Sequence, residues 1–157
     1  MFVLLIVFFL SILMWLLVEH LFNSKQVLLP KSRNEYLKLA QSIVNWCEQN
    51  VILGRQRKSK VKIKISFQKK GDLLGWYDYN TKTIMVYVLK HKDFQSIVNT
   101  TIHEYVHHLQ LRTIRDDVRY NSISIRKGYW DNDFEVEARE ISSKLMYKCI
   151  KELKKIK

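Results

Sequence analysis

"TIHEYVHHLQ", residues 101–110, contains three of the five histidines of this 157-residue chain. His103, Glu104 and His107 spell H-E-x-x-H, and residues i and i+4 of a helix lie one turn apart on the same side. Two imidazoles at this spacing can bind one metal ion. Glu104 lies about 100° around the helix and, in this motif, faces the water at the metal. The alternative is a helix surface that carries three solvated histidines.

The apolar residues around this motif predict which side of the helix is buried. They recur with a helical period and form one stripe, at Phe94, Ile97, Val98, Ile102, Tyr105 and Leu109. His103 and His107 project away from this stripe, so we expect them to line a cleft. Asp93 is the expected N-cap, and the helix should end near Arg112. This pattern favours a metal site over a solvated surface.

The segments on either side of this helix predict an α+β domain. A helix is expected to begin at Ser32, and three strands are expected at residues 61–67, 73–79 and 83–88. The simplest arrangement of the strands is a three-stranded antiparallel meander. In it, the stretch 83–88 is either an internal strand or an edge strand that pairs with an extended substrate. After the motif we expect a long loop over residues 114–132 and a helix from about Asp133 to the basic tail.

A catalytic zinc site needs a third protein ligand beside the two motif histidines. The sequence places two other histidines poorly for this role, His20 and His91, so a carboxylate is required, and "DFEVEARE", residues 133–140, supplies several. Glu135 and Glu137 lie equally far from the apolar stripe of this helix, on opposite sides. Asn132 and Glu135 have the spacing of a helix cap and its partner, which favours Glu137 as the ligand. Glu140, one turn later, could steady that ligand from behind.

The two motifs resemble those of the gluzincin branch of zincin metallopeptidases. "HEYVHHLQ", residues 103–110, looks like the metal helix of small bacterial and phage zincin-like proteins, including the ImmA/IrrE type. "FEVEAR", residues 134–139, looks like their glutamate-bearing helix, and residues 75–88 resemble the hairpin before their metal helix. The resemblance spans residues 61–150 and implies a minimal zincin-like domain. The ligand glutamate of these families directly precedes an alanine, as Glu137 does here.

This resemblance and zinc chemistry imply a metallopeptidase that hydrolyses peptide bonds in a peptide or protein substrate. The implied Zn²⁺ ligands are His103, His107 and Glu137, and Glu104 would act as general base. A donor for the developing oxyanion is expected from the loop after the motif helix, where the candidates are Tyr120, Arg126 and Tyr129. His108 points away from His107, so it is expected at the surface or behind a ligand.

The N-terminal sequence predicts a membrane anchor. Residues 1–18 carry one polar side chain, Ser11, and no charge, and they span roughly 27 Å as a helix. We expect an uncleaved transmembrane helix at residues 1–22, a linker at 23–31 and the zincin-like domain at 32–157. Basic residues follow the apolar segment and none precedes it, so the positive-inside rule places the domain in the cytoplasm.

The net charge of +12 predicts attraction to anionic surfaces. Because the domain is expected to be tethered to a membrane, anionic lipid is favoured over nucleic acid, and the sequence contains no recognisable nucleic-acid motif. Cys47 and Cys149 fall at apolar positions of expected helices and are expected to be buried free thiols. Two other functions remain open: a non-enzymatic zinc-binding regulatory module, and a membrane-tethered basic protein that binds nucleic acid. Structural zinc usually has four protein ligands, often cysteines, and neither cysteine is near the motif.

Overall fold

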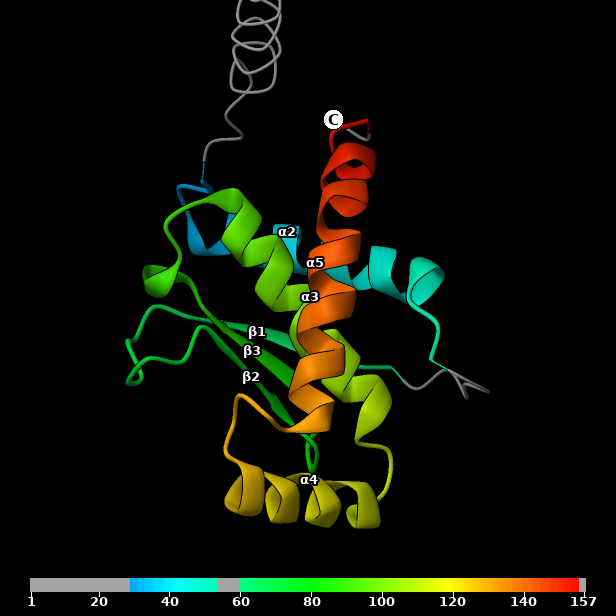
Figure 1. Cartoon of the computed structure of the whole chain (residues 1–157). Helices are drawn as coiled ribbons and strands as arrows, with labels where there is room; N and C mark the ends of the chain where they lie inside the picture. Colours follow the sequence, from blue (N-terminus) through cyan, green and yellow to red (C-terminus); the bar gives the residue numbers. More distant parts are fainter. Residues whose placement is uncertain (1–28, 54–59, 156–157) are drawn as a thin grey trace, which may run out of the picture.

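The computed structural model describes residues 29–53 and 60–155 and shows an α+β fold with helices packed around a small sheet (Figure 1). In chain order, the elements are α2 (Arg33–Asn50), β1 (Lys62–Ser66), β2 (Gly75–Asp78), β3 (Thr83–Tyr87), the short 3-10 helix η1 (Val88–Lys90), α3 (Phe94–Gln110), α4 (Ile114–Lys127) and α5 (Asp133–Leu153). Helix α3 packs against α5, α2 and strands β2 and β3, so it is the central element of the fold. Helix α4 lies at the end of the molecule opposite the C-terminus (Figure 1).

The sheet differs from the expected antiparallel meander. Its strand order is β1-β3-β2, with β1 parallel and β2 antiparallel to β3, so the sheet is mixed. Strand β3 is therefore internal, and the expectation that it could be an edge strand is wrong. Four of its five residues are buried, as in a strand that is covered on both faces. Strand β2 alternates between buried and exposed residues and forms an edge of the sheet.

The long loop expected over residues 114–132 contains helix α4 instead. A capping box begins this helix: the Thr113 hydroxyl accepts a hydrogen bond from the Asp116 amide, and the Asp116 carboxylate accepts one from the Thr113 amide at 2.9 Å. Gly128, with a φ of 82°, ends it. Only Ile123 of this helix is buried. Because α4 lacks the buried apolar stripe of a core helix, hydrophobic periodicity did not predict it.

No helix within residues 29–53 and 60–155 is long and apolar enough to cross a membrane. The expected single-pass membrane protein, with its catalytic domain in the cytoplasm, is therefore not supported by the structure. The segment on which that expectation rested, residues 1–22, lies outside the described residues, as does the linker up to residue 28. The expectation for the thiols is confirmed: Cys47 and Cys149 are free and buried.

Helix α3 is covered on several sides, which explains why polar residues of the motif are buried. Its N-cap is Asp93, as expected, and the Asp93 carboxylate accepts a hydrogen bond from the Ser96 amide at 2.7 Å. Twelve of its 17 residues are buried, among them Glu104, His107 and His108. Buried polar groups need partners inside the protein. The geometry around these three side chains is therefore fixed by the elements that pack on α3.

Strand β2 can approach α3 closely because residue 75 is a glycine. A Cβ atom at Gly75 would lie 2.7 Å from the Thr100 methyl group and 2.9 Å from Cγ of Glu104. Carbon atoms in van der Waals contact are normally about 3.5–4.0 Å apart. Any side chain at this position would therefore push the strand away from the motif helix.

We expect the substitution Gly75→Ala to destabilise the protein by about 1–3 kcal/mol, the usual cost of overpacking a buried site. The free energy of unfolding in urea measures this effect. The cost should be smaller in a Thr100→Ser background, because serine lacks the methyl group that the new Cβ would meet first. An equal cost in both backgrounds would contradict the close packing of β2 on α3.

Candidate metal centre

Helices α3 and α5 bring two imidazoles and one carboxylate together. The Nε2 atoms of His103 and His107 are 3.0 Å apart. His103 Nε2 lies 3.2 Å from Oε2 of Glu135, and His107 Nε2 lies 3.2 Å from Oε1 of the same carboxylate. Glu135 is only 1 % exposed. Three ligand atoms, one from each residue, thus lie within 4.8 Å of one another.

This cluster fits a zinc ion. Two ligands of a tetrahedral zinc with bonds of about 2.0–2.1 Å are about 3.3 Å apart. The distances of 3.0 and 3.2 Å in the cluster are close to that value. Oε2 of Glu135 is buried and has no hydrogen bond to any described residue, although the His103 nitrogen is near it. Two imidazoles and a carboxylate are also a donor set that zinc takes at catalytic sites, with a fourth position left open.

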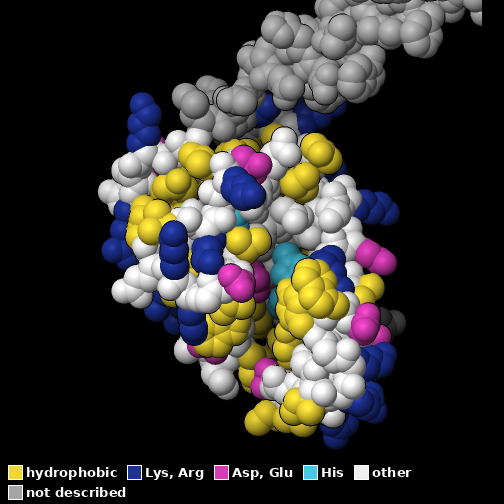
Figure 2. Space-filling model, turned by 60° about the vertical axis from the view of Figure 1, so that its left-hand side comes forward, with side chains coloured by type: hydrophobic (Ala, Val, Ile, Leu, Met, Phe, Trp, Pro, Cys, Tyr) yellow, Lys and Arg dark blue, Asp and Glu magenta, His cyan; other side chains and the backbone are white. Residues whose placement is uncertain are grey.

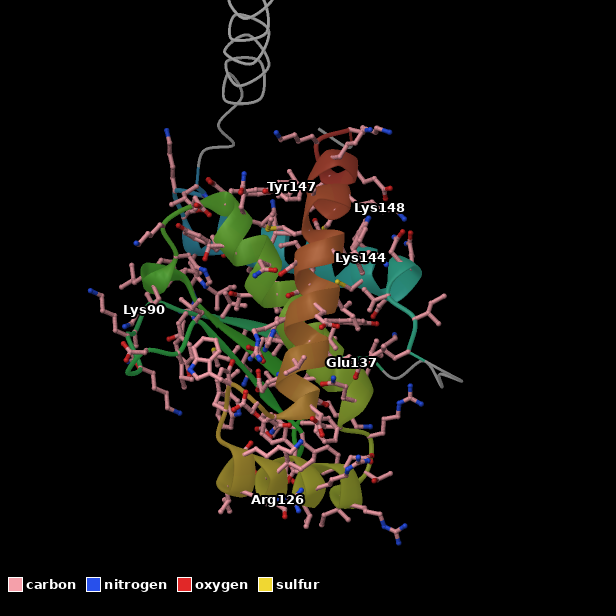
Figure 3. The ribbon with its side chains drawn as sticks, in the orientation of Figure 1. Lys90, Arg126, Glu137, Lys144, Tyr147 and Lys148 are labelled. Atoms are coloured by element: carbon pink, nitrogen blue, oxygen red, sulfur yellow. The ribbon has the colours of Figure 1, made fainter. Side chains whose placement is uncertain are left out.

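The structure corrects the choice of carboxylate from Glu137 to Glu135. The Asn132 side chain caps α5 by accepting a hydrogen bond from the Phe134 amide at 3.0 Å. Glu135 takes no part in that cap, and its carboxylate points to the two imidazoles. Glu137 is exposed on α5, where it accepts a hydrogen bond from Nε2 of Gln110 at 2.8 Å (Figure 3). The capping spacing suggested the wrong residue because Asn132 caps α5 through the Phe134 amide alone, and Glu135 does not complete a capping box.

The carboxylate of Glu135 and the imidazole of His107 shift each other's pKa in a way that favours a positive charge between them. Burial would raise the pKa of Glu135, but the imidazoles of His103 and His107, each 3.2 Å from one of its oxygens, outweigh it and hold that pKa below its usual range. Burial would lower the pKa of His107, but Glu135 and the charge of Glu104 outweigh it and raise that pKa. Without a metal, the Glu135 carboxylate therefore favours a proton on His107. A metal cation would take the place of that positive charge.

Glu104 is buried between the cluster and strand β2. It is 7 % exposed, and burial raises the pKa of its carboxyl group although the two motif histidines lower it. Its carboxylate accepts a hydrogen bond from the backbone amide of Tyr77 in β2. Leu74 accepts a hydrogen bond from the Tyr87 amide at 2.9 Å, so the antiparallel ladder turns the backbone groups of Gly75 and Tyr77 to the free edge. The edge strand thus positions Glu104 directly.

The third histidine of the motif helix contacts the edge strand and is no part of the cluster. Nδ1 of His108 is 3.0 Å from the hydroxyl oxygen of Tyr77, and both side chains are buried. Tyr77 is therefore held by α3 at two points, by Glu104 at its amide and by His108 at its ring. His108 was expected at the surface or behind a ligand, and it stabilises the strand beside Glu104 instead.

Two of the three candidate oxyanion donors lie at the site. Tyr120 of α4 donates a hydrogen bond from its hydroxyl to Oε1 of Glu135 at 2.6 Å. Tyr129 lines the same pocket. Burial, together with the negative charge of Glu135, raises the pKa of both phenols, so both remain protonated donors. Arg126, near the end of α4 (Figure 3), and Glu140, on α5, are exposed and lie outside the pocket lining.

The cluster lies in a pocket of about 320 Å³ between β2 and α4. Figure 2 shows histidine side chains at the bottom of this hollow, with hydrophobic side chains on its rims. The lining includes residues of β2 and the aromatic residues Trp76, Tyr79 and Tyr129. The two imidazoles, the carboxylate and Glu104 therefore all face a space that a substrate can enter.

No family model, curated protein or solved structure matches the chain. The resemblance to gluzincins therefore rests on the residues of the two motifs. The structure also weakens the second motif of this resemblance, a ligand glutamate followed by alanine. The carboxylate beside the imidazoles is Glu135, which is followed by Val136, whereas the alanine follows Glu137. Sequence reasoning missed Gly75 and Gln110. The three-residue spacing of His107 and Gln110, one helical turn, was the available signal for Gln110.

We expect Glu135→Gln to lower the affinity for zinc by orders of magnitude, because it removes the charged ligand of the cluster. Glu137→Gln removes the same charge two residues away and keeps an oxygen that accepts the Gln110 hydrogen bond, so its affinity should stay within about fivefold of the unchanged protein. Zinc titrations against a competing chelator would measure both dissociation constants. A larger loss in Glu137→Gln than in Glu135→Gln would contradict this assignment.

Proposed function

We propose that this protein is a zinc-dependent peptidase that hydrolyses peptide bonds in a peptide or protein substrate. The observation that supports it most is the convergence of the His103, His107 and Glu135 ligand atoms beside the buried carboxylate of Glu104, at the bottom of an open pocket. When bound, zinc supplies Lewis acidity, which lowers the pKa of water at the site to about 7 and polarises a carbonyl group.

Glu104 would move the proton in this reaction. Its raised pKa makes it a stronger base than an exposed glutamate. It would accept a proton from the attacking water and later donate that proton to the leaving amine. The hydrogen bond from the Tyr77 amide keeps one side of its carboxylate fixed, so the carboxylate does not have to reorient between these two steps.

The free edge of β2 is the surface that best fits an extended substrate. It borders the pocket, and the ladder leaves backbone groups of Gly75 and Tyr77 on that side. The Tyr77 amide already binds Glu104, so a substrate would pair with the remaining groups. An extended chain along β2 would pass over the Glu104 carboxylate and bring a peptide bond to the cluster.

We expect Glu104→Gln to retain zinc and to lose hydrolysis by about 10²-fold or more, because the amide keeps the shape of the side chain and cannot accept the proton. Cleavage of heat-denatured, fluorescein-labelled casein would measure turnover, and a chelator titration would confirm the zinc. Glu140→Gln, an exposed change on α5, is the matched control and should keep full activity. Full activity in Glu104→Gln would contradict the proposed mechanism.

We expect Tyr120 to affect mainly zinc affinity and Tyr129 to affect mainly turnover. Tyr120→Phe removes the hydrogen bond to Glu135, so we expect the zinc dissociation constant to rise by about 10-fold or more. Tyr129 also interacts with Glu135, so Tyr129→Phe should weaken zinc binding less than Tyr120→Phe does, and it should lower kcat by about 10²-fold as the donor to the developing oxyanion. Steady-state kinetics at saturating zinc distinguish the two. A loss of kcat in Tyr120→Phe alone would assign the oxyanion donor to Tyr120.

A further inference from the structure

A chain of hydrogen bonds lies behind His107, on the side away from the cluster. Nδ1 of His107 is 2.8 Å from Oε1 of Gln110, the last residue of α3. Nε2 of Gln110 donates to the carbonyl oxygen of Phe134 at 3.0 Å and to Oε2 of Glu137 at 2.8 Å. Both acceptors belong to α5, the helix that also carries Glu135.

These bonds determine which way the Gln110 amide faces. A backbone carbonyl and a carboxylate can only accept hydrogen bonds, so the NH₂ group of Gln110 must face Phe134 and Glu137. Its oxygen is then the atom that faces His107, and this oxygen can only accept. Nδ1 of His107 must therefore carry a hydrogen. In a neutral imidazole with Nδ1 protonated, the lone pair is on Nε2, the atom that faces His103 and Glu135.

We propose that Gln110, oriented by Glu137, is a positioning residue that fixes the tautomer and the ring orientation of His107 for metal binding. This inference rests on the metal site of the proposed function. In this arrangement the carboxylate of Glu137 orients the side-chain amide of Gln110, and that amide orients the imidazole of His107. Partners behind a metal ligand commonly contribute 10- to 100-fold to metal affinity.

A purely structural role is the competing explanation, because the same two hydrogen bonds connect α3 to α5. The structural explanation and the positioning explanation differ in whether an acceptor atom must face Nδ1 of His107. If Gln110 only connects the helices, its oxygen is not needed. If it positions His107, an acceptor must face Nδ1, whichever residue provides the opposing donor.

The test exchanges the two side chains. Gln110→Met keeps the size of the side chain and removes the acceptor and the donors. We expect its zinc dissociation constant, measured against a competing chelator, to rise by 10- to 100-fold. The double variant Gln110→Glu/Glu137→Gln again presents a carboxylate oxygen to His107, and the amide at position 137 donates to it. The Phe134 carbonyl loses its donor in this variant, so we expect partial recovery, with a zinc dissociation constant at least fivefold below that of Gln110→Met.

A second readout follows the imidazole proton itself. In the zinc-loaded protein, the Nδ1 proton of His107 should give a slowly exchanging NMR signal in the unchanged chain and in the double variant. In Gln110→Met it should exchange rapidly with water. Unfolding in urea, measured on all three proteins, separates loss of the helix connection from loss of positioning.

Two results would overturn the inference while the metal site stands. One is a zinc affinity of Gln110→Met within threefold of the unchanged protein. The other is a double variant that binds zinc as weakly as Gln110→Met although its unfolding free energy is restored. An unchanged protein that binds no zinc would instead overturn the metal site and this inference together.

Discussion

The carboxylate of Glu135, buried against the imidazoles of His103 and His107, is the interaction on which the site depends. A buried charge costs several kcal/mol unless partners compensate it. Here the compensation comes from two imidazoles on α3, from the Tyr120 hydroxyl on α4 and, at 4.0 Å, from the Arg139 guanidinium on α5. The carboxylate can be satisfied only when α3, α4 and α5 are all in place. It therefore fixes the relative position of the three helices more strictly than apolar contacts would.

The polar side chains of α3 point in two directions. One side turns His103 and His107 toward Glu135. The other turns toward β2, where Glu104 binds the amide of Tyr77 and His108 contacts the hydroxyl of the same residue. This division explains why three histidines lie so close together in the motif, because His108 stabilises the strand that positions Glu104. Gly75 makes the contact possible, since any side chain there would separate strand and helix.

The parts of this fold that follow from local chemistry could be predicted from the sequence. Helical periodicity predicted α3, Asp93 was correctly expected to cap it, and the motif spacing placed His103 and His107 on one side. The order of the strands depends on pairing between residues distant in sequence, which no local pattern contains. The choice between Glu135 and Glu137 depends on how α5 crosses α3. A local capping argument could not contain that crossing angle, and it gave the wrong residue.

Helix α4 shows how the site and the fold constrain each other. Only Ile123 of this helix is buried, and the Tyr120 ring packs on Phe134 and His107, so polar contacts add to a small apolar contact in attaching the helix. One is the 2.6 Å hydrogen bond from Tyr120 to Glu135, and another is the 2.6 Å hydrogen bond from the Asn132 amide to Ser124. The first of these ends on an oxygen of Glu135, in the cluster with His103 and His107. The charge state of Glu135 therefore affects both the cluster and the attachment of the helix that forms one wall of the pocket.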